Sequence, residues 1–249
     1  MHLLPAPLDL LLAVFILAAA FLYASVGQAG ASGYLAVMAI FGLAPEVMRP
    51  TALTLNIIVA AVAASKFARA GYFNGSVFWP FAVTSIPFAF LGGMIDLPEL
   101  VYKPVVGVVL LYAAFLMFRA SRGSDGAVIN PPPLGWALIS GAGIGLLSGL
   151  TGVGGGIFLS PLLLFMGWAE TRQTAATSAA FILVNSIAGL LGHASSIANL
   201  PGAIPVWAAA ALAGGFIGAE YGSRHFGSLT LKRILVVILL VAGVKMLLP

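Results

Sequence analysis

Apolar runs of roughly bilayer-spanning length recur through all 249 residues of this chain. Crossing the hydrocarbon core takes a helix of roughly 20 residues, because a backbone in lipid must satisfy its hydrogen bonds within its own segment. The composition agrees, since 61% of residues are hydrophobic and 7% are charged, against about 25% charged in a soluble domain. The sequence therefore predicts an all-α integral membrane protein whose first partner is the lipid bilayer.

Charge and cysteine content exclude several functions. The formal net charge is +4, but the basic residues are scattered among the loops and form no patch for nucleic acid. The chain has no cysteine, so disulfides, thiolate catalysts and cysteine metal sites are excluded. No cofactor and no metal are expected. The first apolar run is preceded by no Lys or Arg and carries Asp9, which indicates a retained helix rather than a cleaved signal peptide.

An internal repeat divides the chain. At an offset of 123 residues, "GYLAVMAIFGLAPEVMRPTALT" from Gly33 aligns with "GIFLSPLLLFMGWAETRQTAAT" from Gly156. The matches include Arg49 with Arg172, Thr51 with Thr174, and Thr54 with Thr177. We therefore expect a first transmembrane repeat over 1–119, a cytoplasmic linker over 120–133 and a second transmembrane repeat over 134–249.

Each half is expected to contain five apolar segments. They are predicted at 8–26, 31–43, 51–70, 76–94 and 102–119, and at 134–150, 156–167, 174–192, 203–221 and 230–248. The second segment of each half is too short to span comfortably and follows a glycine run. That pattern is typical of a broken or re-entrant helix pair, here followed by three spanning helices.

The positions of Lys and Arg bear on the orientation of the halves. If each short pair enters the membrane and returns, one side collects Lys66, Arg69, Arg119, Arg122, Arg172, Arg224, Lys232 and Arg233, and the other keeps Arg49, Lys103 and Lys245. If each pair makes one net crossing, the halves are parallel and the basic residues divide almost evenly. The positive-inside rule thus favours two inverted repeats, with both termini outside and the linker in the cytoplasm.

The glycine runs "GQAGASG" (27–33) and "TGVGGG" (151–156) are the candidate site. The second run does not suit a P-loop, because Ile157 and Phe158 follow its last glycine where Lys and Ser or Thr are needed. Unpaired N–H groups at a helix N-terminus favour an anion, and glycine permits close approach. The expected substrate-binding residues are Gln28, Gly30, Ser32, Gly33, Thr54, Asn56, Thr151, Gly152, Gly154, Gly155, Gly156, Thr177, Ser178 and Asn185, beside Thr51 and Thr174. Arg49 and Arg172 could draw the anion toward this site.

Structural explanations stand beside these assignments. Glycine-rich membrane segments also form close helix-packing seams, and membrane Ser and Thr often bond the carbonyl four residues earlier. Arg49 and Arg172 could instead reach the interface or hold Glu46 and Glu170.

An intramembrane serine protease is the competing class of function. "GASG" at 30–33 matches the nucleophile pattern of rhomboid-like proteases, and His193 is a conceivable partner for Ser32. Ser32 is matched by Gly155 in the other half, and His193, near a helix end, is expected to be solvated. We therefore expect no catalytic residue and no enzymatic activity.

The runs "GLLSGLTGVGGGIFLSPLLL" and "TRQTAATSAAFILVNSIAGLLGH" resemble the sulfite exporter TauE/SafE family. The resemblance implies a secondary transporter that exports sulfite, sulfoacetate or a related sulfonate through the bacterial inner membrane. Residues that match the family pattern are Thr151, Gly152, Gly154, Gly155, Gly156, Thr177, Ser178 and Asn185. The first half departs from it, because "GQAGASG" replaces the triple glycine, so Gln28 and Asn56 could select a different anion.

The acidic residues lie at or near the ends of the predicted segments: Asp9, Glu46, Asp96, Glu99, Asp125, Glu170 and Glu220. A proton antiporter normally places a titratable group within its pathway. We therefore expect electrogenic anion export in which one repeat rocks against the other. A substrate that carries its own proton, another small anion, and a channel remain alternatives, and a homodimer is compatible with so small a transporter.

Overall fold

The computed structural model describes residues 7–120, 130–194 and 200–224, and beyond them residues 236, 237, 240, 243, 244 and 247. Its helices are α1 (Pro7–Ala24), α2 (Ala31–Ile40), α3 (Pro45–Arg69), α4 (Gly75–Met94), α5 (Glu99–Ala120), α6 (Leu134–Thr151), α7 (Gly156–Phe165), α8 (Thr171–Gly192) and α9 (Ile204–Arg224). The all-α prediction is confirmed. Most of the segment predicted over 230–248 and most of the 120–133 linker lie outside the described residues.

Helix lengths separate the spanning helices from the short ones. Within the described residues, α1, α3, α4, α6, α8 and α9 are each long and apolar enough to cross a membrane. In contrast, α2 and α7 have 10 residues each, or about 15 Å of helix. The prediction that the second segment of each half is too short to span is confirmed.

Both short helices end in the same type of turn. After α2, the N–H of Leu43 donates to Met38 O at 3.0 Å, across Gly42 at φ 75°. After α7, the N–H of Trp168 donates to Leu163 O at 2.9 Å, across Gly167 at φ 65°. This is the Schellman motif, which needs a left-handed residue and therefore favours glycine. The two turns lead directly into α3 and α8.

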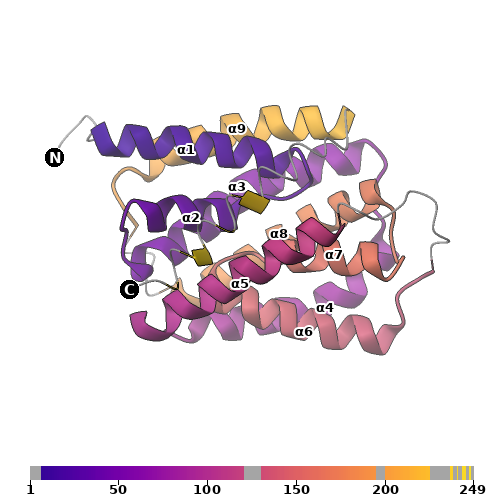
Figure 1. Ribbon diagram of the computed structural model, residues 1–249. Helices are drawn as coiled ribbons and strands as arrows, with labels where there is room; N and C mark the ends of the chain where they lie inside the picture. The colour runs from indigo at the N-terminus through magenta and orange to yellow at the C-terminus, as the bar shows by residue number, and fades with distance from the viewer. Residues whose placement is uncertain are drawn as a thin grey trace.

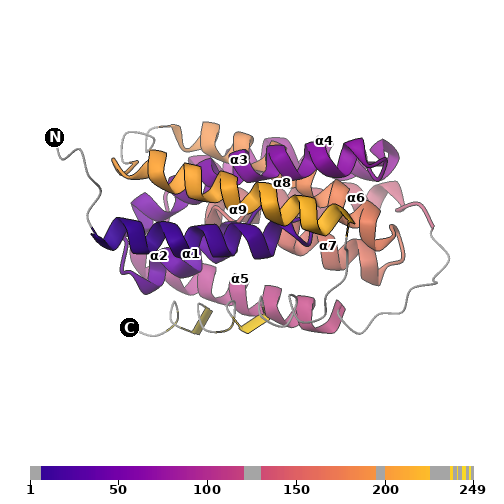
Figure 2. The same cartoon turned by 90° about the horizontal axis from the view of Figure 1, so that it is seen from above.

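The first helix of each half packs on the fourth helix of the other half. Gly214, Gly218 and Gly222 of α9 lie against the backbone of Leu17, Phe21 and Ser25 in and just after α1. In the same way, α6 lies against α4 through Gly141, Gly145 and Gly149, which touch the backbone of Phe81, Ser85 and Ala89. Residue numbers rise together in both pairs, so each pair runs parallel, and Figures 1 and 2 show α1 beside α9.

The third helices of the two halves, α3 and α8, pack against each other in the interior and run antiparallel. Arg49 near the start of α3 contacts His193 just after α8, and Arg172 near the start of α8 contacts Tyr72 just after α3. In Figure 1 both helices follow the long axis of the bundle. Most of the buried polar residues that the sequence selected lie on these two helices.

Candidate functional site

The second glycine run forms a sharp break between α6 and α7, which we call the second break (residues 151–156). Gly152, Gly154 and Gly155 have φ values of 80°, 81° and 80°, a left-handed conformation that other residues rarely adopt. Gly155 is the N-cap of α7 and supplies no side-chain cap. The first N–H groups of a helix have no acceptor within it, so the second break presents bare backbone donors.

Asn56, near the middle of α3, lies against this break. Its side chain is fully buried, and a Cβ atom added to Gly154 would lie 2.5 Å from its Nδ2. Nδ2 donates to Val153 O at 3.4 Å and to Ser186 Oγ of α8 at 3.3 Å. The Oδ1 atom of Asn56 has no hydrogen-bond partner among the described residues. Asn56 therefore joins α3, α8 and the second break at one buried point.

Ser186 was missed by the sequence interpretation. It directly follows Asn185 and is fully buried in the interior of α8. A second small polar residue beside a mid-helix asparagine is the signal that could have found it.

Several of the expected binding residues form side-chain hydrogen bonds within their own helix. The hydroxyl of Thr54 donates to Pro50 O at 2.8 Å, and that of Thr151 donates to Leu147 O at 2.6 Å. Asn185 Nδ2 donates to Phe181 O at 2.8 Å. These are the bonds to the carbonyl four residues earlier that a structural role predicts.

Other polar side chains have no hydrogen-bond partner among the described residues, or form a hydrogen bond to another helix. The hydroxyls of Thr51, Thr174 and Thr177 are buried and have no partner among the described residues. The hydroxyl of Ser160 on α7 donates to Ser178 Oγ on α8 at 2.8 Å. Ser178 therefore ties α7 to α8.

The segment between α1 and α2, which we call the first break (residues 25–30), overlaps the first glycine run and is closed by aromatic side chains. The Tyr34 hydroxyl donates to Ala29 O at 2.6 Å, and its ring leaves no room for a Cβ at Gly30. Ser32 Oγ donates to the Tyr23 hydroxyl at 2.9 Å. A Cβ at Gly33 would meet the Tyr23 ring at 2.8 Å, so these small residues serve close packing.

The other members of the first glycine run also pack inward. Gln28 is buried, with 4% of its surface exposed. The backbone of Gly27 lies against Ala175 of α8. The first break thus contacts α8, whereas the second contacts α3. The closing tyrosines were missed by the sequence interpretation, although Tyr34 stands where the other half has Ile157.

Arg49 is buried, with 3% of its surface exposed. Its guanidinium donates to Gly93 O at 2.7 Å, Ile95 O at 2.9 Å and Leu150 O at 3.3 Å. It also contacts His193 Nδ1 and lies 3.5 Å from an Asp96 carboxylate oxygen. The acidic neighbour in these contacts is Asp96 rather than the expected Glu46.

The expectation that His193 is solvated is wrong. His193 is 4% exposed, and its Nδ1 lies 3.3 Å from Asp96. It packs beneath the end of α4, where Arg49 and the carbonyl of Gly93 surround it. Burial first, and then the Arg49 charge, lower the pKa of His193.

Arg172, at the matching position of the second half, is exposed and contacts the Tyr72 hydroxyl, with its guanidinium 5.1 Å from the ring centre. Cation–π contacts at exposed sites are weak. The two arginines therefore differ in environment, although the sequence gives them equivalent places.

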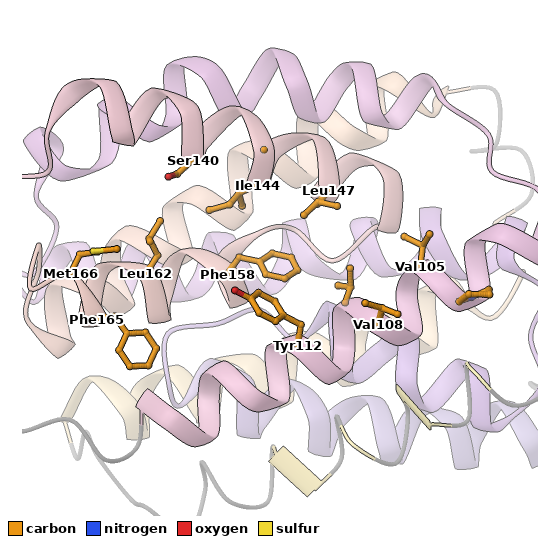
Figure 3. A pocket seen from close by; sticks show the side chains of 13 residues that line it. Val105, Val108, Tyr112, Ser140, Ile144, Leu147, Phe158, Leu162, Phe165 and Met166 are labelled. Atoms are coloured by element: carbon orange, nitrogen blue, oxygen red, sulfur yellow. The ribbon is translucent and has the colours of Figure 1, made fainter.

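A cavity of about 860 Å³ lies between α5, α6 and α7. Figure 3 shows apolar side chains around it, among them Val105, Val108, Leu147 and Phe158. The Tyr112 ring stacks on Phe158 with centroids 6.5 Å apart. An apolar lining cannot replace the hydration of an anion, so this cavity does not suit the expected substrate.

The protease alternative finds no catalytic pair in this arrangement. Ser32 is bonded to Tyr23, and His193 contacts Arg49 and Asp96 at the end of α8. Among the described residues, no cluster of three or more His, Asp or Glu side chains is suited to a metal ion.

The sequence is similar to sequences of known proteins. A family model described as "Sulfite exporter TauE/SafE" matches residues 11–246. The chain belongs to the TauE/SafE family. Like other TauE/SafE members, it is thus assigned to a family of membrane transporters, in agreement with its candidate spans.

A named relative agrees with that assignment. The chain is 46% identical over 243 residues to the probable membrane transporter protein y4hK of Sinorhizobium fredii (strain NBRC 101917 / NGR234), and the match covers 96% of this chain and 98% of the relative. No solved structure gives a significant match.

Proposed function

We propose that this TauE/SafE protein is a secondary transporter that exports a small sulfur-containing anion, such as sulfite, sulfoacetate or a related sulfonate, across the bacterial inner membrane. The observation that carries the proposal is the second break. It holds an uncapped helix N-terminus beside fully buried Asn56, close to the middle of α3. Bare N–H groups and a helix dipole at such a depth provide an anion site without a cationic side chain.

Transport by alternating access is supported by the way in which helices of one half pack on helices of the other. The third helices α3 and α8 run antiparallel, and each first helix packs on the fourth helix of the other half. Two inverted repeats would produce this arrangement, and rocking of one repeat against the other would expose the site to either side. With both termini outside, the 120–133 linker is cytoplasmic; homodimerisation stays a prediction with no assigned interface.

Export needs no coupled ion in this proposal. Moving one negative charge out of a negative-inside cell gains about 2.3 kcal/mol per 100 mV. Other expected binding residues would line the route from the second break to the opposite side of the membrane. They include Gln28 on the first break and Thr177 and Ser178 on α8. Arg49 and Arg172 would act on the anion through their charge near the two ends of that route.

The test is uptake of radiolabelled sulfite into proteoliposomes under an imposed membrane potential. The informative variant is Gly154→Ala, which places a Cβ against Asn56 and strains a backbone at φ 81°. The matched control is Gly143→Ala in α6, where a Cβ meets nothing within 4 Å.

We expect saturable flux that follows the potential, is lost in Gly154→Ala and is kept in Gly143→Ala. Flux that ignores the potential would contradict electrogenic export. Flux without saturation would favour a channel, and no flux of sulfite or longer sulfonates would refute the proposed substrate class.

A further inference from the structure

The two breaks differ in what they offer a ligand, although the sequence repeat makes them equivalent. At the first break, the Tyr34 ring covers Gly30, and the Tyr34 hydroxyl donates a hydrogen bond to the carbonyl oxygen of Ala29. At the second break, Ile157 stands in place of Tyr34, and the polar neighbours are Asn56 and Ser186. At the offset of 123 residues, their counterparts are Ala179 and Ala63. The second break thus combines a bare helix N-terminus with a fully buried amide oxygen, Asn56 Oδ1, that has no partner among the described residues.

The orientation of the Asn56 amide follows from its neighbours. Nδ2 faces the carbonyl oxygen of Val153 and Ser186 Oγ. Exchanging Oδ1 and Nδ2 would set two carbonyl oxygens against each other, so the nitrogen belongs on this side. The remaining atom, Oδ1, is a buried acceptor with no partner. A buried acceptor left unpaired is costly, which points to a ligand group that donates a hydrogen bond.

The second break therefore favours a ligand that both accepts and donates hydrogen bonds. The N–H groups at the start of α7 donate, so they call for an anionic oxygen. Asn56 Oδ1 accepts, so it calls for a hydroxyl proton. No cationic side chain is seen to donate a hydrogen bond into the site, because the nearby Arg49 directs its guanidinium to backbone carbonyls and lies 3.5 Å from an Asp96 carboxylate oxygen that offsets its charge. A second negative charge would be costly to desolvate there.

We propose that the second break selects a monoanion that keeps one hydroxyl proton, such as hydrogen sulfite, and that this proton is donated to Asn56 Oδ1. This inference rests on the proposed transport function and names the form of the substrate. The proton then crosses the membrane on the substrate, so no carboxylate is needed within the pathway. Asn56 is the residue that determines specificity.

Two monoanions separate the hydroxyl contribution from charge. Hydrogen sulfite can donate a hydrogen bond, whereas methanesulfonate carries a methyl group in that role. We expect proteoliposomes of the parent chain to prefer hydrogen sulfite over methanesulfonate by about tenfold, the usual order for one unpaired buried acceptor. In Asn56→Leu, which has no acceptor, this ratio should fall to near one. Tyr34→Phe, which removes the first-break hydroxyl, should keep the parent ratio.

A measurement on the parent chain covers the case in which Asn56→Leu does not fold. At fixed total sulfite, competition against methanesulfonate should strengthen as the pH falls through neutrality and hydrogen sulfite replaces the dianion. Among the described residues, the titratable side chains that contact the second break are Arg49 and Tyr102. Next to these two lie His193, Asp96 and Glu46. Histidine titrates in this range, so His193→Gln should show the same pH profile.

The outcomes distinguish this inference from the transport proposal. If neither anion is carried, the transport proposal fails. If both are carried with equal preference, if Asn56→Leu keeps the parent ratio, or if the competition ignores pH, transport stands and the selection of a protonated monoanion is refuted. A pH profile that disappears in His193→Gln would also refute it, because the proton would then belong to the protein.

Discussion

Arg49 donates a hydrogen bond from its buried guanidinium to the carbonyl oxygen of Gly93 at 2.7 Å. Gly93 lies in the last turn of α4, so the bond fixes the start of α3 to the end of α4. The same guanidinium reaches Leu150 O at the end of α6 and His193 just after α8. One side chain therefore joins the ends of four helices on a single side of the bundle.

Replacing Arg49 with Met should lower the free energy of unfolding by about 2 to 4 kcal/mol, because buried carbonyls lose their donor. Arg172→Met is the matched control and should cost less than about 1 kcal/mol, because Arg172 is exposed. Thermal or denaturant unfolding in detergent micelles measures both. Equal losses in the two variants would show that burial of Arg49 does not decide its contribution.

His193 should make stability depend on pH. Burial and the Arg49 charge lower its pKa from the ordinary value of 6.5, so the unfolded chain binds this proton at a higher pH than the folded chain. The stability that His193 contributes is therefore present above about pH 6.5 and is lost as the pH falls toward its folded pKa. Unfolding curves between about pH 8 and about pH 5 should show a decline that is smaller in His193→Gln. A steeper decline in that variant would reverse the assigned sign.

The α4–α6 seam should distinguish two glycines of the same helix. A Cβ at Gly145 would lie 2.2 Å from Ser85 O, whereas one at Gly143 meets nothing within 4 Å. Gly145→Ala should destabilise by about 1 to 3 kcal/mol through overpacking. Gly143→Ala should be neutral or stabilise by up to about 1 kcal/mol, because alanine favours helix. Melting temperatures of the two variants in detergent test the contrast, and a stabilised Gly145→Ala would contradict the seam.

Single cysteines can test the orientation of the two halves, because the chain has no native cysteine. Glu46 near the start of α3 and Glu170 just before α8 are both exposed and occupy similar places in the repeat. We expect Glu46→Cys to react with an impermeant reagent from outside intact cells and Glu170→Cys to react only after permeabilisation. Labelling of both from the same side would exclude inverted repeats.

The lengths and positions of the apolar runs were enough to predict the described helices. The segment predicted at 134–150 is helix α6 at Leu134–Thr151, and that predicted at 76–94 is α4 at Gly75–Met94. This succeeds because the bilayer requires helices of a certain length, whatever their neighbours are. The starts of α3 and α8 lie earlier than predicted, at Pro45 and Thr171. Polar and charged residues in their first turns interrupt the apolar pattern without breaking the helix.

The candidate site was predictable only in outline. Glycine runs mark where backbone is bare, and that part of the interpretation needs no tertiary information. Whether a hydroxyl is available depends on its neighbours, and Thr54 and Thr151 turn to carbonyls of their own helices. The burial of His193 depends on α4 and Arg49, which lie far from it in the sequence. Tertiary contacts of this kind leave no local pattern.

The exchange of first helices between the halves makes the chain the covalent counterpart of a domain-swapped pair. Gly218 of α9 fits the backbone of Phe21, and Gly145 of α6 fits that of Ser85, so the interior of each half is completed by a helix encoded in the other. A half-length chain would expose these close-fitting glycine grooves to lipid unless another helix filled them. We therefore expect the groove on α1 to stay unfilled until α9 has entered the membrane.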